Sequence, residues 1–520
     1  MPEKPTIEQL QAIAHVYNLH LSDAELESFR GLMSATFESY RRIDQLPEPV
    51  LPVHYARSGG YRPTAEENPL NAWYQKCSIK GAASGPLAGK RIAIKDNVCV
   101  AGVPMMNGSV VLEGYVPEFD ATIVTRILDA GGEIVGKAVC ESLCFSGSSF
   151  TADTGPVHNP HYPAYSAGGS SSGSAALVVA GECDMAIGGD QGGSISIPSA
   201  WCGAYGLKPT YGLVPYTGVF PVEQTLDHTG PIAASTADVA LLLEVIAGED
   251  GLDPRQNGVK PGAYTSALRN DTEGIRIGIV REGFGWPALS ENDVDEQVEA
   301  AARRFSEIGS QVSTLSVPMH RDGKHIWNAI KVEGSAMLMV RGNSIGTNWK
   351  GHYSISLLDA YAHGRVTMAD HFFETLKFAI LLGEYMQDSY HGRYYAKAQN
   401  LARTLTHVYD NALQTVDLLV MPTTPMKAPM LPPGDATLEE KVARASGMNG
   451  GLNANNCPFN VTGHPVMTVP CGLSGGLPIG MMLVGRRGED ATVLRAAHAF
   501  EQISGYTVRP KPSSALPNHY

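Results

Sequence analysis

The sequence predicts an α/β fold with a mixed central sheet covered by helices on both faces. Short apolar runs alternate with helical patterns along most of the chain, and hydrophobic residues make up 43% of its 520 residues. Strands separated by helices pair into a parallel or mixed sheet whose faces the helices cover. The composition supplies apolar material for a sizeable core, and it excludes a disordered or collagen-like chain.

The strand–helix alternation begins near residue 85. Apolar residues at helical spacing predict the helices, and short apolar runs bounded by glycine or polar residues predict the strands. We expect, in chain order, strand 91–95, helix 121–130, strand 133–139, helix 172–180, strand 184–187, helix 239–247, strand 275–280, helix 294–308, strand 312–317, strand 417–421 and helix 491–503.

The first stretch, residues 1–80, is expected to form a separate helical arm. Thr6 with Gln9, and Ser22 with Glu25, have the spacing of a capping box at a helix N-terminus. Apolar residues on such helices must be covered by something. The arm is therefore either a packing appendage or a dimerisation element, and the dimerisation role is the sharper prediction.

The remaining chain divides into a core and an insertion. We assign 81–285 and 401–520 to the core that carries the sheet. Residues 286–400 are assigned to a smaller inserted domain, because much of this stretch is helical in pattern and rich in aromatic residues. This domain is expected to cap the active site.

Charge and cysteine content exclude several classes of protein. A formal net charge of −13 argues against a nucleic-acid or anionic-membrane surface, since both need clustered Lys and Arg. The eight cysteines are scattered without a C-x-x-C pair, which predicts neither a disulfide scaffold nor a zinc site. Without an apolar leader or a spanning segment, we expect a cytoplasmic protein. We also expect no metal and no cofactor.

Two glycine-serine loops are the most unusual feature of the sequence. They span 167–174 and 188–196, and one predicted helix and one short strand separate them. Glycine allows backbone N–H groups to converge on an anion, and a serine beside such a group is well placed as a nucleophile. A single loop of this kind is more often a tight turn, but two together favour a catalytic site.

A serine nucleophile needs a base, and Lys95 is the candidate. It ends the predicted strand 91–95. Burial of a lysine without a partner lowers the pKa of such a side chain and lets it accept a proton near neutrality. The alternatives are a lysine paired with Asp96 or exposed at a sheet edge.

Other catalytic patterns fit less well. Ser171 lies in a G-x-S-x-G sequence, which in a nucleophile elbow must follow a strand directly, yet a proline-containing polar loop precedes it. His158 and His161 form H-x-x-H without the other ligands of a metal site, so we interpret them as loop histidines.

Together, these motifs resemble the amidase signature family, over residues 70 to 505. The pattern is most similar to the bacterial amidases found beside nitrile hydratases, which are three-part and typically dimeric. The matching motifs are Ile-Lys-Asp-Asn (94–97), Val-Pro-Met-Met-Asn-Gly-Ser (103–109), Gly-Gly-Ser-Ser-Ser-Gly-Ser (168–174), Asp-Gln-Gly-Gly-Ser-Ile (190–195), Gly-Ala-Tyr-Gly-Leu-Lys-Pro-Thr (203–210), Leu-Asp-His-Thr-Gly-Pro (226–231) and Asn-Val-Thr-Gly-His-Pro (460–465).

The resemblance implies a Ser-cisSer-Lys triad. Ser194 would be the acylated nucleophile, Ser170 the bridging serine with a cis peptide bond, and Lys95 the base. The resemblance also implies that N–H groups of the nucleophile loop hold the oxyanion, those of Gln191, Gly192, Gly193 and Ser194.

The segment after the strand at 133–139 is expected to shape the acyl pocket. In the family, the residues matching Cys144, Phe145 and Ser146 do so, and Phe150 and Trp327 would add an aromatic wall; ordinary core packing is the alternative. The sequence departs from most relatives at Ser196, where they carry Arg, and we expect this to affect local packing and substrate range.

The expected function is hydrolysis of small carboxylic acid amides, with the amide and water as the small-molecule partners and a homodimer as the assembly. A carbamate, anilide or aryl ester would suit the same triad. A chain that works within a transamidation complex is the alternative from another class.

Overall fold

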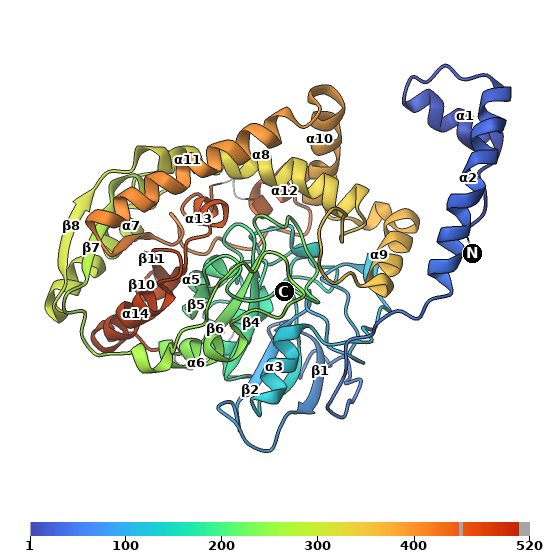
Figure 1. Ribbon diagram of the computed structural model, residues 1–520. Coiled ribbons are helices and arrows are strands. Elements are labelled where there is room, and N and C mark those ends of the chain that lie inside the picture. The colour runs from blue at the N-terminus through green and yellow to red at the C-terminus, as the bar shows by residue number, and fades with distance from the viewer. Residues whose placement is uncertain (1, 447–450, 509–520) are drawn as a thin grey trace. The chain divides into compact units, whose positions relative to one another are not determined.

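A mixed sheet forms the centre of the molecule (Figure 1). The computed structural model describes residues 2–446 and 451–508. Within this part of the chain the sheet has eleven strands in the order β1-β3-β2-β4-β6-β5-β10-β11-β9-β7-β8. The strands are β1 Trp73–Lys80, β2 Arg91–Lys95, β3 Glu133–Ala138, β4 Met185–Asp190, β5 Tyr205–Lys208, β6 His228–Ala233, β7 Arg276–Val280, β8 Gln311–Leu315, β9 Leu418–Pro422, β10 Val466–Ser474 and β11 Leu477–Gly485.

Parallel and antiparallel pairs both occur in the sheet. Strand β2 is parallel to β3 and β4, and β7 is parallel to β8 and β9, whereas the pairs in the middle of the sheet are antiparallel. The helices that accompany the strands are α1 Ile7–Val16, α2 Asp23–Asp44, α3 Thr122–Asp129, α4 Ser172–Ala180, α5 Ser196–Cys202, α6 Thr236–Ile246, α7 Asn292–Arg303, α8 Gly323–Ser335, α9 Ile355–Thr367, α10 Glu374–Tyr390, α11 Arg393–Thr415, α12 Leu438–Ser446, α13 Cys457–Thr462 and α14 Asp490–Ser504.

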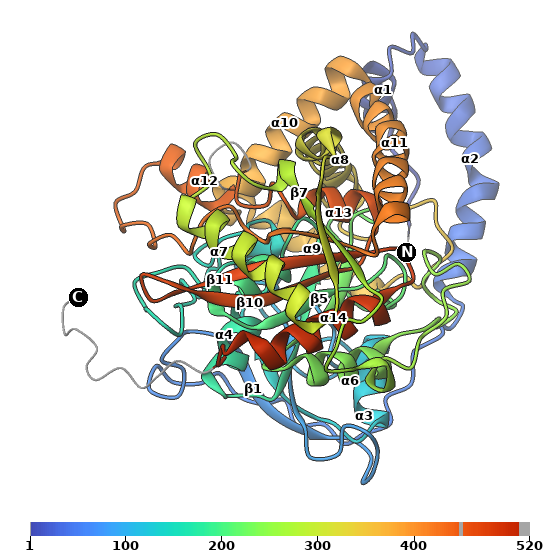
Figure 2. The same ribbon diagram turned by 90° about the vertical axis from the view of Figure 1, so that its left-hand side faces the viewer.

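Helices cover both faces of the sheet, as predicted. Helices α7 and α14 pack on β10 and β11 and lie in front of them in Figure 2. Helices α8, α10 and α11 pack on one another and run along the upper side of Figure 1.

Strand β2 shows how the two faces divide. Ile92 and Ile94 belong to the core cluster that includes α3 and α6, whereas Ala93 belongs to the cluster on the opposite face, which includes α4. Because side chains alternate along a strand, Lys95 shares the face of Ala93.

Most predicted elements are present within a few residues of their expected bounds. Helix α4 matches its prediction at both ends, and Gly131 and Gly132 follow the end of α3. The sequence reading missed five strands, which all make antiparallel pairs: β1, β5, β6, β10 and β11. Their partners are distant in sequence or, for β10 and β11, joined by a tight Gly475-Gly476 turn.

The domain boundaries differ from the prediction. The first compact unit ends at Pro52, rather than at residue 80, and the second begins at Val53. The reason is β1, which pairs with β3 and so belongs to the sheet. The expected insertion 286–400 also begins too early, because β8 pairs with β7 inside the same second unit.

The first unit consists of α1 and α2. Both predicted capping boxes are present: Gln9 N–H donates to Thr6 Oγ1 at 3.2 Å, and Ser22 N–H donates to Glu25 Oε2 at 2.8 Å. Leu10, Ala14 and Leu26 are its buried apolar residues.

Two further observations bear on the predicted class of protein. The eight cysteines all lie in the described part of the chain and are free thiols, and seven of them are buried. Among the described residues, no helix combines the length and apolarity that crossing a bilayer requires.

Candidate active site

Lys95 is fully buried at the end of β2, an interior strand. Its Nζ lies 2.7 Å from Ser170 Oγ and donates to the Gly189 carbonyl at 3.2 Å. The alternative pairing with Asp96 is not formed, because Asp96 makes an ion pair with Lys137 at 3.1 Å. The lysine is therefore held against a serine hydroxyl, away from solvent and from a neutralising carboxylate.

The two glycine-serine loops are bonded directly to each other. The N–H of Ser171 donates to the Ser194 carbonyl at 3.2 Å, and Ser171 Oγ donates to the Gly189 carbonyl at 3.1 Å. The peptide bond between Gly169 and Ser170 is cis. Ser194 is 7% exposed, in contrast to Ser170, which is fully buried. Direct hydrogen bonds thus hold the two loops together, and Ser194 is the more exposed of the two serines.

Glu141 braces the first loop. Its N–H donates to the Ser170 carbonyl at 3.2 Å, and its carboxylate accepts from the hydroxyls of Ser148 and Thr151, both at 2.9 Å. Burial raises the pKa of Glu141 to about 7, although these hydrogen bonds act in the opposite direction. A Cβ at position 169 would collide with the Ser148 carbonyl oxygen, so only glycine fits there.

Asp190 organises the second loop. Its carboxylate accepts from the N–H groups of Gly193 at 2.6 Å and Ile195 at 2.7 Å, and from the Asn460 amide at 2.9 Å. The Gly193 N–H is therefore bonded to Asp190 rather than turned toward a substrate, which corrects the expected oxyanion set. Gly193 also has a φ of +115°, a conformation that glycine adopts without strain.

Trp327 closes the second loop from helix α8. Its Nε1–H donates to the Gln191 carbonyl at 2.7 Å, and its ring packs on Gly192, where an added Cβ would lie 2.5 Å from the ring. The Gln191 side-chain amide donates to Tyr216 Oη at 2.9 Å. These contacts hold Gln191 and Gly192 through groups from two separate parts of the chain.

Cys144 lies beside the lysine and the bridging serine. Burial raises the pKa of its thiol, but hydrogen bonding with Cys140, the charge of Lys95 and hydrogen bonding with Ser170 outweigh burial and lower the pKa to about 7. Its Sγ and that of Cys140 both bond to Asn107 Oδ1, at 3.4 and 3.3 Å. These contacts place Cys144 next to Lys95 and Ser170.

The other expected pocket residues divide into two groups. Phe145 and Trp327 both lie close to Lys331, whose Nζ is 3.8 Å from the first ring centroid and 5.3 Å from the second. Ser146 Oγ instead donates to the Ala445 carbonyl at 3.0 Å. Phe150 stacks edge-on against Phe373, with ring centroids 6.0 Å apart.

The rejected patterns have structural roles. Ser171 is fully buried, and no strand directly precedes its loop, since β3 ends at Ala138. His158 Nδ1 bonds to the Pro163 carbonyl and His161 Nε2 to that of Cys202. No cluster of three metal-binding side chains occurs within the described residues.

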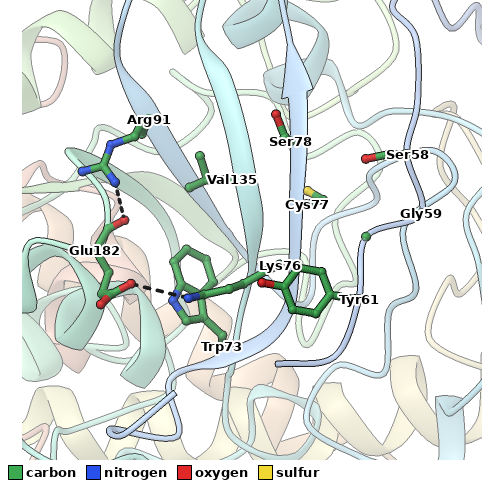
Figure 3. Close-up of a pocket in the computed structure, with 11 residues that line it drawn as sticks. Ser58, Gly59, Tyr61, Trp73, Lys76, Cys77, Ser78, Arg91, Val135 and Glu182 are labelled. Atoms are coloured by element: carbon green, nitrogen blue, oxygen red, sulfur yellow. Dashed lines mark hydrogen bonds and ion pairs between the residues drawn. The ribbon is translucent and has the colours of Figure 1, made fainter. Parts of the chain in front are cut away.

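A recess of about 620 Å³ lies elsewhere, at the β1 edge of the sheet (Figure 3). Lys76 crosses the face of Trp73 there and pairs with Glu182 at 3.7 Å, and Arg91 donates to the Glu182 carbonyl. Its lining includes none of the expected catalytic residues, so this recess is separate from the candidate site.

Four functional residues of the site were not identified from the sequence as such: Glu141, Asp190, Asn460 and Lys331. Asp190 and Asn460 lie inside the motifs that carried the resemblance, so their positions were visible although their roles were not. Glu141 and Lys331 lie outside those motifs, and their contacts with Ser170 and Phe145 join segments distant in sequence, which no local pattern reveals.

Comparison with known proteins agrees with this geometry. The family model described as Amidase matches residues 62–494. An enantioselective amidase from Rhodococcus rhodochrous is 43% identical over 517 residues, 98% of each chain. A glutamyl-tRNA(Gln) amidotransferase subunit from Methanosarcina acetivorans is 35% identical, over 88% of this chain and 95% of that protein. The crystal structure of a bacterial aryl acylamidase of the amidase signature family superposes with a TM-score of 0.68 at 25% identity, covering 85% of this chain and 91% of that one.

The chain therefore belongs to the amidase family, and the predicted resemblance and α/β fold are confirmed. Membership makes the protein a hydrolase.

Proposed function

We propose that the protein hydrolyses the C–N bond of small aromatic or aliphatic carboxylic acid amides through an acyl-enzyme at Ser194. The observation that carries the proposal is the buried contact of 2.7 Å between Lys95 Nζ and Ser170 Oγ. The loops that carry Ser170 and Ser194 are hydrogen-bonded to each other, which supports a relay between the two serines.

The proton path follows from this arrangement. The Lys95 amine takes the proton of Ser170, which takes that of Ser194 as the Ser194 oxygen attacks the amide carbonyl. The tetrahedral intermediate collapses with cleavage of the C–N bond, and the returning proton leaves with the nitrogen as ammonia. Water then gives a proton to the same relay as it attacks the ester at Ser194. Return of that proton to the Ser194 oxygen releases the acid.

The oxyanion is assigned to the N–H groups of Gln191, Gly192 and Ser194. Gly193 is left out of this set because Asp190 accepts its N–H. Support comes from Trp327 and Asn460, which hold the loop at the Gln191 carbonyl and at Asp190. Donors fixed in advance stabilise the developing charge without reorganisation.

The acyl group is assigned to the side of the site formed by Cys144, Phe145 and Trp327. The two rings are buried, and such surfaces suit the apolar body of an aromatic or aliphatic acyl group. The 43% identity to an enantioselective amidase supports an amide as the substrate class.

The decisive experiment replaces the nucleophile. Ser194→Ala is expected to abolish benzamide hydrolysis and to prevent covalent labelling by a fluorophosphonate, as read by intact-protein mass spectrometry. Ser174→Ala is the matched control, since this buried hydroxyl donates to the Ile187 carbonyl, at 2.9 Å. Retained turnover in Ser194→Ala would contradict the proposal.

Two alternatives share the same triad. Rates on benzamide, an anilide and an ethyl carbamate distinguish a hydrolase of primary amides from a hydrolase of anilides or carbamates. The similarity to an amidotransferase subunit favours a second candidate, a chain that works within a complex. Hydrolysis by the purified single chain, without ATP, tRNA or a second protein, would exclude it.

A further inference from the structure

We propose that Lys331 is a specificity residue that binds an anionic group, such as a carboxylate, on the acyl portion of the substrate. This inference rests on the proposed function, because it concerns the same pocket. It adds a substrate class: amides whose acyl group carries a negative charge at the end remote from the scissile bond.

The placement of Lys331 is the first step. It lies on α8 one helical turn after Trp327, and residues four apart lie on the same helix face. Its Nζ is 3.8 Å from the centroid of Phe145 and 5.3 Å from that of Trp327. The ammonium group therefore lies on the two rings assigned to the acyl side of the site.

Trp327 belongs to the candidate active site by direct contact, and Phe145 is adjacent in sequence to another residue of the site. Trp327 donates to the Gln191 carbonyl and packs on Gly192. Phe145 directly follows Cys144, whose thiol is next to Ser170. A charge held between these rings is thus close to where an acyl group bonded to Ser194 would extend.

Lys331 has no anionic partner in the described part of the chain. Its contacts are the two ring faces, which attract a cation but offer no lone pair for its three N–H donors. Burial lowers the pKa of Lys331 to about 8, so most of the molecules carry the charge at pH 7.

The nearby acids are engaged elsewhere. Glu333, on the same helix, accepts from the Gln387 amide of α10 at 3.1 Å. Glu223, which packs against α8 at Gly334, accepts from Tyr395 Oη of α11 at 2.9 Å. Burial raises the pKa of both carboxyl groups. Neither forms an ion pair with Lys331.

A substrate carboxylate would supply both missing elements, the opposite charge and the hydrogen-bond acceptors. Charge-assisted hydrogen bonds are stronger than neutral ones. The same lysine disfavours an acyl group that carries a positive charge. The pocket should therefore prefer anionic over neutral acyl groups of equal size.

The test compares 3- and 4-carboxybenzamide with the matching nitrobenzamides, which have nearly the same shape but no charge. The nitro group activates the carbonyl more strongly, so a preference for the carboxylate must come from binding. We expect kcat/KM to favour one carboxybenzamide isomer by roughly tenfold or more at pH 7. Lys331→Met should remove this preference, and Lys331→Arg should retain it.

Two further arms complete the experiment. Lys324→Met is the matched control, since Lys324 is on the same helix and lies 5.3 Å from the centroid of a different ring, Trp286; it should leave the ratio unchanged. In the unmodified protein, the preference should decline as the pH rises through about 8, because Lys331 loses its charge.

Binding to the Ser194→Ala variant separates this inference from the proposed function. Calorimetric titration with the four compounds measures the preference without turnover. If the protein turned over none of the amides, the proposed function would fail, and the titration would still decide the role of Lys331. An equal preference before and after Lys331→Met, in rate or in binding, would overturn the inference.

Discussion

Lys95 and Lys137 show how one position decides the chemistry of a buried amine. Both are fully buried on paired parallel strands, yet Lys137 is neutralised by Asp96, and Lys95 has contacts with Ser170 Oγ and the Gly189 carbonyl. A paired lysine keeps its proton because the carboxylate stabilises the charge. The amine beside a hydroxyl is the one suited to accept a proton.

The role of Lys95 predicts the effect of its removal. Lys95→Ala should lower kcat for benzamide by roughly 10²–10⁴-fold, as loss of a general base does, while the protein remains folded. Stopped-flow acylation rates and near-UV circular dichroism measure the two properties. Lys90→Ala, a partly exposed lysine just before the same strand, serves as the control. A near-normal acylation rate in Lys95→Ala would exclude the base assignment.

Glu141 predicts a pH dependence of stability. Its folded pKa, raised to about 7, exceeds that of the unfolded chain, so the folded state holds a proton that the unfolded state releases. The free energy of unfolding should therefore fall as the pH rises from about 4.5 to 7. Glu141→Gln should remove this decline and be more stable above pH 7 by on the order of 1–3 kcal/mol. Urea unfolding of both proteins at pH 5 and pH 8 tests this prediction. An equal difference in the free energy of unfolding between Glu141→Gln and the unmodified protein at the two pH values would contradict it.

At the scale of the element, the loop after β4 is shaped by one carboxylate. Asp190 ends β4 and accepts the N–H groups at the start of α5, so strand, loop and helix are joined by a single side chain. Helix N-terminal N–H groups need such acceptors, and an unsatisfied buried N–H is costly. The loop conformation thus depends on Asp190 as much as on its glycines.

Asp190→Asn should therefore disturb the loop. Asparagine offers one acceptor oxygen where the carboxylate offers two, so either Gly193 or Ile195 loses its partner. We expect a loss of about 1–3 kcal/mol in the free energy of unfolding, and a slower reaction of Ser194 with a fluorophosphonate. Asp184→Asn, at the opposite end of β4, is the control for stability and labelling. Unchanged labelling in Asp190→Asn would show that the loop holds its shape without the charge.

At the scale of the whole molecule, the first unit presents apolar side chains to solvent. Val16, Tyr17, Leu32 and Ile43 are 73%, 71%, 75% and 65% exposed on or next to α1 and α2. A set of exposed apolar residues on one pair of helices indicates an interaction surface. A second copy of the chain is the partner we propose, in keeping with the predicted homodimer.

This proposal predicts that charge on the surface prevents association. Val16→Asp combined with Leu32→Asp should convert a dimer into a monomer, as measured by sedimentation velocity at micromolar concentration. Val366→Asp, at an equally exposed apolar residue on α9, should leave the dimer intact. A full-length chain that sediments as a monomer would refute the dimer.

The same difference of scale explains what could be predicted. The capping boxes at Thr6 and Ser22 and the ends of α4 were recognised because their signals lie within a few residues. Strand β1 was missed because its pairing with β3 brings together segments more than 50 residues apart. The N–H of Gly193 was misassigned because glycine alone does not show which acceptor its backbone faces.

The sequence by itself determined the family, the sheet class and the three residues of the proposed triad, because these depend on motifs whose order and spacing are local. Tertiary structure decided which lysine contacts a serine and which backbone N–H groups already have an acceptor. It also decided that Lys331 lies against the rings of Phe145 and Trp327. Each of these depends on contacts between side chains brought together by packing, and packing distances are not encoded in the spacing of any single motif.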